Sequence, residues 1–168
     1  GAVATAAPDL VAAARIGGEH PIPLMDDLFA EFPDCHFNID LKSPGSGPAL
    51  IELIDKHAAH DRVRVGAFSL ERMHEFRRLS RGRVATAATP AEVVAFLQPI
   101  ARLARLVTGG AVSAVQVPPR RGALTIITRA FVRRAHAAGA QVHAWTIDQA
   151  DEMHRLLDLG VDGIFTDR

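Results

Sequence analysis

The chain has 168 residues, of which 48% are hydrophobic and 23% charged, a composition typical of one folded domain with a substantial core. Basic and acidic residues number 19 each, so we expect no nucleic-acid partner, and no apolar stretch is long enough to predict a membrane span. The single cysteine, Cys35, excludes an internal disulfide and favours a reducing compartment, which predicts a cytoplasmic protein.

Strands and helices alternate along most of the chain. Apolar and alternating segments predict six strands, which begin near residues 37, 63, 84, 111, 141 and 163. Helices are predicted over residues 8–15, 23–32, 46–60, 69–82, 90–107, 125–138 and 149–159.

Several helix starts carry capping signals. Thr89 and Glu92 have the spacing of a capping box, and Pro90 lies at the first helical position between them. Asp148 is predicted to cap the helix that follows it, and Pro23 is predicted in the first turn of its helix. The helix over 90–107 is expected to kink at Pro99.

Six strands separated by helices predict a parallel sheet with right-handed crossovers. Both the doubly wound open sheet and the closed eight-stranded barrel use this repeat. Since a barrel usually needs about 250 residues, counting alone narrowly favours the open sheet. The chain has no G-x-G-x-x-G and no P-loop, so a nucleotide-binding version lacks its usual signature.

The strand predicted at 37–42 carries polar residues on one face. Asn38, Asp40 and Lys42 alternate with apolar residues. In a parallel sheet covered on both faces, an unpaired carboxylate or ammonium would cost several kcal/mol. We therefore interpret this polar face as the candidate active site.

Three stretches resemble the glycerophosphodiester phosphodiesterase family. They are residues 22–28 leading into 37–42, residues 63–68, and the ending Val142-His143-Ala144-Trp145-Thr146-Ile147-Asp148 with Gly160-Val161-Asp162-Gly163-Ile164-Phe165-Thr166-Asp167. The resemblance covers nearly the whole chain as a single domain, from the third barrel strand of the family to its eighth. It implies a TIM barrel of the phospholipase-C-like phosphodiesterase type, incomplete here, with six of its eight βα units.

The resemblance also implies an activity. Family members hydrolyse glycerophosphodiesters to glycerol 3-phosphate and an alcohol with Ca²⁺ or Mg²⁺, and two histidines serve as acid and base. Those histidines belong to a His-Arg-Gly motif on the first strand and a His-Asp motif after the second, and the sequence predicts no strand before residue 20 to hold these motifs. We therefore assign no catalytic residue in this chain, expect the 168-residue chain alone to be inactive, and expect its natural start to lie before Gly1.

Four positions match the binding site of the family. Asp40 stands where the family usually has a metal-binding Glu, and Lys42 matches a phosphate contact. Trp145 matches an aromatic wall beside the glycerol moiety, although a lone tryptophan is often simple core. Phe68 matches the aromatic of a Ser-Phe strand ending in which Ala67 replaces the serine, and we expect its main role to be packing.

Other charged residues are interpreted mainly as structural. His57 and His60 lie at a helix end without a third ligand, whereas His143 is expected to line the interior. A solvated helix end is predicted for Arg77, Arg78, Arg81 and Arg83. The loop pair Arg120 and Arg121 is as consistent with solvent as with a phosphate contact.

Two alternatives remain open. One is a non-catalytic binding or assembly module derived from the family, which would bind phosphate or diester without turnover. The other is an unrelated doubly wound protein, which requires exposed Asp40 and Lys42 with Trp145 far from both. An incomplete barrel would also leave two edge strands open, which predicts self-association.

Overall fold

The computed structural model describes residues 8–99 and 101–168, and it contains all six predicted strands in one parallel sheet. The strands are β3 (Phe37–Asp40), β4 (Val63–Gly66), β5 (Ala85–Ala87), β6 (Val112–Val117), β9 (Gln141–Ala144) and β10 (Gly163–Ile164).

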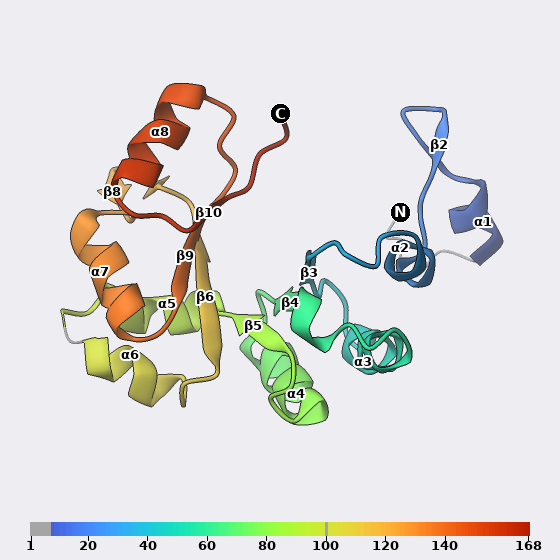
Figure 1. The fold of residues 1–168 in the computed structure, drawn as a ribbon, viewed down its shortest axis with the longest axis horizontal. Helices are drawn as coiled ribbons and strands as arrows, with labels where there is room; N and C mark the ends of the chain where they lie inside the picture. Colours follow the sequence, from blue (N-terminus) through green and yellow to red (C-terminus); the bar gives the residue numbers. More distant parts are fainter. Residues whose placement is uncertain (1–7, 100) are drawn as a thin grey trace.

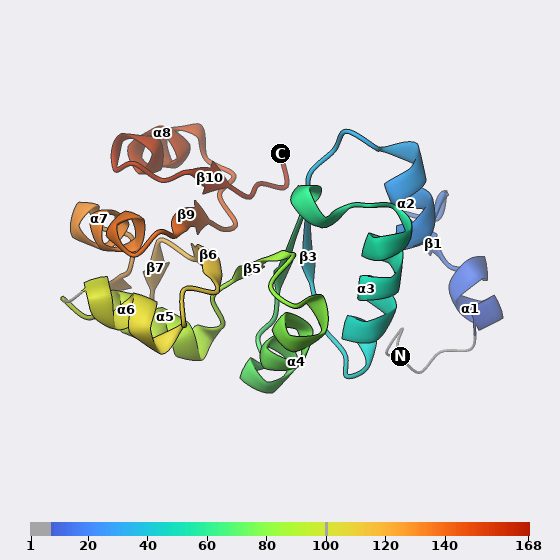
Figure 2. The same cartoon turned by 60° about the horizontal axis from the view of Figure 1, so that its bottom comes forward.

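The order of the strands decides between the two architectures. It is β10-β9-β6-β5-β4-β3, so each strand lies beside its predecessor in the chain and the order never reverses. A doubly wound sheet reverses its order and carries helices on both faces. Here the sheet curls, and the helices between its strands follow one another along its convex side (Figures 1 and 2). The fold is therefore an incomplete TIM barrel, and the preference for an open sheet from strand counting was wrong.

The helices and short strands complete the chain. The helices are α1 (Pro8–Ala13), α2 (Met25–Glu31), α3 (Ser46–Lys56), α4 (Leu70–Ser80), α5 (Pro90–Leu97), α6 (Ala101–Val107), α7 (Arg129–Ala137) and α8 (Ala150–Asp158), with a 3-10 turn, η2 (His60–Arg62). Two small antiparallel hairpins pair β1 (Arg15–Ile16) with β2 (His20–Pro21) and β7 (Arg120–Arg121) with β8 (Leu124–Thr125). None of the described helices is long and apolar enough to cross a membrane.

The capping box of α5 is confirmed, because Thr89 Oγ1 accepts from the amide of Glu92 and the Glu92 carboxylate accepts from the amide of Thr89. The predicted kink at Pro99 is instead a break between α5 and α6. Gln98 adopts an extended backbone with ψ of 151°, as expected for a residue that precedes proline.

Three predicted helix starts were wrong. Helix α2 begins at Met25, beyond Pro23, and helix α7 begins at Arg129 because Thr125 pairs in strand β8. Gln149, not Asp148, occupies the N-cap of α8 and makes no side-chain cap bond. The Asp148 carboxylate is engaged elsewhere, since its Oδ1 accepts from Thr166 Oγ1 and from the amide of Asp167, both at 3.0 Å. This carboxylate ties the loop after β9 to the loop after β10.

The core lies between the sheet and its helices in two clusters. One packs α2, α3 and α4 against β3 and β4, and its fully buried side chains include Phe29, Ile54, Val65, Met73 and Phe76. The other packs the later helices against β6 and β9, and includes Phe96, Val115, Ile127, Phe131 and Leu156.

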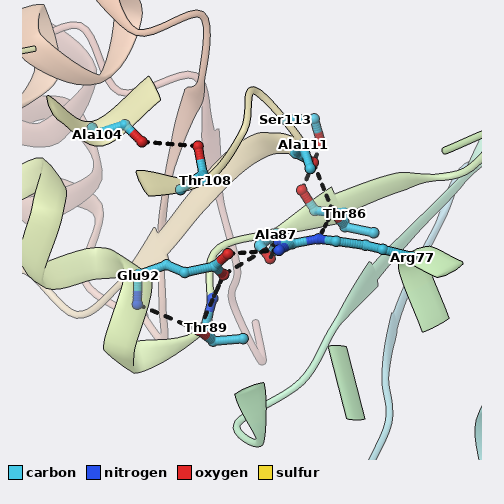
Figure 3. A network of polar contacts seen from close by, with 9 residues as sticks. All are labelled: Arg77, Thr86, Ala87, Thr89, Glu92, Ala104, Thr108, Ala111 and Ser113. Carbon is cyan, nitrogen blue, oxygen red and sulfur yellow. Dashed lines mark hydrogen bonds and ion pairs between the residues drawn. The ribbon is translucent and has the colours of Figure 1, made fainter. Parts of the chain in front are cut away.

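A buried ion pair joins α4 to α5 (Figure 3). Arg77 Nη1 lies 2.6 Å and Nη2 3.2 Å from the two carboxylate oxygens of Glu92, and Arg77 Nε donates to Thr86 Oγ1 at 2.9 Å. The Arg77 side chain is 13% exposed and that of Glu92 5%. The prediction that Arg77 belongs to a solvated helix end was therefore wrong.

Candidate active site

Asp40 and Lys42 lie at the carboxyl end of the sheet, where the strands end. Asp40 is the last residue of β3 and pairs in register with Gly66 of β4. The next residue, Leu41, is buried, its amide donates to the Gly66 carbonyl at 2.9 Å, and its carbonyl accepts from Arg72 Nη1 at 2.6 Å. Both peptide groups of Leu41 are thus held, which fixes the backbone between Asp40 and Lys42.

Asp40, Lys42 and Phe68 come together at this point. The Lys42 ammonium pairs with Asp40 Oδ2 and lies 5.0 Å from the centroid of the Phe68 ring. The Phe68 side chain is 63% exposed, so the expectation that it mainly packs was wrong. Its contact with a cation is of the kind in which a ring face stabilises positive charge.

The second carboxylate oxygen of Asp40, Oδ1, is buried and has no hydrogen-bond partner among the described residues. A buried carboxylate oxygen without a partner is costly, and a cation is one group that would satisfy it. Within residues 8–99 and 101–168, however, no group of three or more His, Cys, Asp or Glu side chains is placed to hold a metal ion. Asp40 therefore fits as one ligand of a cation and not as a complete site.

Trp145 follows directly after β9, so it lies at the same end of the sheet, but β4, β5 and β6 separate its strand from β3. Its side chain is 36% exposed, and no described ring contact or hydrogen bond joins it to Asp40, Lys42 or Phe68. Arg120 and Arg121 form β7 in the exposed loop after β6, also at this end.

The histidines considered above are accounted for by structural contacts. His57 Nε2 lies 2.6 Å from Asp26 Oδ1, and His60 Nε2 lies 2.8 Å from Asp55 Oδ1. His60 with Asp61 is a His-Asp dipeptide, but it lies in η2 ahead of β4, at the amino end of the sheet and away from Lys42. It does not take the place of the family's acid/base motif.

Polar residues on the concave face form a second group, nearer the amino end of the sheet. Gln116 Nε2 donates to Asn38 Oδ1 at 2.6 Å, and Arg64 donates to Gln141 Oε1 at 2.8 Å. His143 lies between them, which confirms the prediction that it lines the interior. Burial lowers the pKa of His143, the nearby Arg64 charge lowers it further, and Asp162 opposes this effect, so the ring is neutral at pH 7.

Sequence reasoning missed Arg64 and Gln116. The alternation of Val63, Arg64 and Val65 was a visible signal, because a charge between two buried valines must face the other side of the strand. Gln116 was harder to place, because the register between β5 and β6 shifts at Thr86 and Ala87 and this breaks the simple alternation along β6.

Comparison with known proteins identifies the family of this incomplete barrel. The sequence model of the glycerophosphoryl diester phosphodiesterase family matches residues 5–168, nearly the entire chain. The chain belongs to this family.

Two relatives show how much of a family member the chain represents. It is 41% identical over 160 residues to the Mycobacterium tuberculosis protein named "Probable glycerophosphodiester phosphodiesterase 2", in a match that covers 92% of this chain and 60% of that protein. It is 27% identical over 156 residues to the Bacillus subtilis glycerophosphodiester phosphodiesterase, with coverage of 86% and 50%. The chain thus spans between half and 60% of the length of these relatives.

Solved structures support the fold of the family. A crystal structure from Galdieria sulphuraria matches with a TM-score of 0.75 at 20% identity, covering 99% of this chain and 68% of that one. A glycerophosphodiester phosphodiesterase from Parabacteroides distasonis matches with a TM-score of 0.68 at 15% identity, covering 95% and 66%. At these identities the likeness concerns the fold, and it agrees with a partial barrel.

Proposed function

We propose that this chain forms the larger part of the barrel of a metal-dependent glycerophosphodiester phosphodiesterase, which releases glycerol 3-phosphate and an alcohol. The observation that carries the proposal is the group of Asp40, Lys42 and Phe68 at the carboxyl end of β3 in a half-barrel of this family. TIM-barrel enzymes bind their substrates at that end of the sheet.

Each residue has a chemical role in this proposal. Lys42, with a side chain 72% exposed, would contact the phosphate and offset the negative charge that develops there. Asp40 would give one oxygen ligand through Oδ1 to Ca²⁺ or Mg²⁺, a hard cation that polarises a phosphoryl oxygen when bound. Phe68 and Trp145 offer exposed ring surface for the glycerol moiety.

Proton transfer is the part that these residues do not supply. His57 and His60 are paired with Asp26 and Asp55, and His143 lies on the concave face nearer the amino end. A general acid or base must lie within hydrogen-bond reach of the group it serves. We therefore propose that the acid/base pair lies on a further segment of a longer protein, as the partial coverage of the relatives supports.

An assay of glycerol 3-phosphate release tests whether the acid/base pair lies outside the 168-residue chain. With glycerophosphocholine and Ca²⁺ or Mg²⁺, we expect no turnover by the 168-residue chain and hydrolysis by a form that adds the two further strands of a complete barrel. EDTA should abolish the hydrolysis. Turnover by the 168-residue chain that is lost in Lys42→Met would show that the acid/base group lies within these residues.

The non-catalytic alternative gives a different result in the same assay. In this alternative, the Asp40–Lys42 pair serves binding and not catalysis. In that case the extended form would bind glycerol 3-phosphate but release none from the diester.

The two lateral strands of the sheet predict self-association. In the described part of the chain, β3 and β10 each have a neighbour on one side only. Unpaired strand edges are templates for pairing with another chain. We expect light scattering of the 168-residue chain to show dimers or larger species, and a monodisperse monomer across the concentration range would contradict this.

We also propose a cytoplasmic location, which the lone free and exposed Cys35 supports.

A further inference from the structure

A pocket of about 290 Å³ lies on the concave face, toward the amino end of the sheet and away from Lys42. Its wall includes Ala85 and Gly163, whose small size leaves the space open. Its charged and titratable lining residues are His36, Asp61, Arg62, Arg64 and His143.

Arg64 lies in this pocket without a counter-ion among the described residues. It is half-buried, and it donates through Nε to Ser113 Oγ at 3.2 Å and through Nη2 to Gln141 Oε1 at 2.8 Å, while Nη1 lies 3.4 Å from His143 Nε2. No carboxylate of the described residues pairs with it, and residues 1–7 and 100 include no Asp or Glu.

The unused N–H groups of Arg64 are donors suited to an anion. A guanidinium carries five N–H groups, so these three contacts leave one N–H on each terminal nitrogen without a partner among the described residues. Two parallel N–H groups of this kind bind a carboxylate or phosphate through two oxygens at once. Burial lowers the pKa of Arg64, which shows that its charge is partly desolvated and would gain from a bound anion.

Arg62 and Asp61 play different parts in the pocket. Arg62 donates to the carbonyls of Phe29 and Phe32 and stacks 5.1 Å from the Phe29 ring centroid, so its guanidinium is engaged with the protein. Asp61 is exposed in the middle of η2 and contributes a negative charge that opposes an anion.

We propose that this pocket binds a small oxyanion of the phosphate class through the two free N–H groups of Arg64. The lining of this pocket does not include Asp40, Lys42, Phe68 or Trp145, so the proposal does not depend on the proposed function. The neutral ring of His143 lies 3.4 Å from the guanidinium and lines the pocket. Its NMR signals should therefore shift when an anion binds to Arg64.

An NMR titration of the 168-residue chain with inorganic phosphate tests the proposal, at constant ionic strength with chloride as the replacement anion. We expect a saturable shift of the His143 ring signals with a dissociation constant in the millimolar range. Arg64→Gln should weaken this binding at least tenfold, Arg64→Lys should weaken it less, and Asp61→Asn should tighten it.

The controls separate this pocket from other basic surfaces. Lys42→Met removes the cation at the other end of the sheet and should leave the His143 isotherm unchanged, as should Arg155→Gln, whose guanidinium is already paired with Glu152. Circular dichroism establishes that each variant is folded. A linear response of His143 to phosphate, or an unchanged isotherm in folded Arg64→Gln and Arg64→Lys, would overturn the proposal.

Discussion

Replacing Glu92 with alanine should lower the free energy of unfolding by about 3 to 5 kcal/mol, because it leaves the Arg77 guanidinium buried without its counter-ion. The carboxylate also accepts from the amide and hydroxyl of Thr89, at 2.8 Å and 3.0 Å, so the same change removes half of the capping box of α5 (Figure 3). Urea denaturation followed by circular dichroism measures the difference.

A matched control is the exposed pair of α8. Arg155 contacts Glu152 at 2.6 Å, as closely as Arg77 contacts Glu92, but both of its side chains are far more exposed. We expect Glu152→Ala to change stability by less than about 1 kcal/mol, as is usual for surface ion pairs. Equal effects of the two substitutions would show that burial does not strengthen the Arg77–Glu92 pair.

The stability that Glu92 contributes should also depend on pH. Burial alone would raise the pKa of Glu92, but its bonds to Arg77 and Thr89 outweigh burial and lower the pKa below the ordinary value of 4.5. A group with a lowered pKa in the folded state stabilises the fold above its unfolded pKa and loses this effect as the pH falls through the folded value. The difference between wild type and Glu92→Ala should therefore be full above about pH 5 and shrink in more acidic solution.

The sequence predicted the fold through its repeat and missed details that depend on contacts distant in the chain. The six strands were predictable because each has a local apolar pattern, whereas the choice between an open sheet and a barrel depends on strand order, which no local pattern contains. The resemblance of the motifs to a barrel family predicted the barrel. The helix predicted from Thr125 begins later in the structure, because Thr125 pairs with Arg120 across a hairpin.

The candidate site was partly predictable for the same reason. Alternation along residues 37–42 identified Asp40 and Lys42 as neighbours on one face, and the structure pairs them. The exposure of Phe68 and the burial of Arg77 were not predictable from local sequence. Each depends on what lies opposite, which is Lys42 for Phe68 and the carboxylate of Glu92 for Arg77.

Replacing Lys42 with methionine should reduce kcat/KM for glycerophosphodiesters by about 10²–10³ in the extended, active form, since one charged donor to a developing negative charge is removed. In the 168-residue chain, the same change should weaken binding of glycerol 3-phosphate. Methionine keeps much of the side-chain volume beside Phe68, so packing is little changed. Lys56→Met is the matched control, because Lys56 is the other lysine of the chain and forms an exposed pair with Asp26.

Asp40→Asn tests the proposed cation ligand independently of the phosphate contact made by Lys42. The amide keeps the shape of the side chain but removes the negative charge that the proposed cation needs, so the concentration of Ca²⁺ or Mg²⁺ required for half-maximal activity should rise. Lys42→Met should instead lower the rate even at saturating metal, because its charge acts on the phosphate. If both variants retained wild-type rates and metal dependence, the carboxyl end of β3 would have no part in catalysis, and the Asp40–Lys42 pair would be structural.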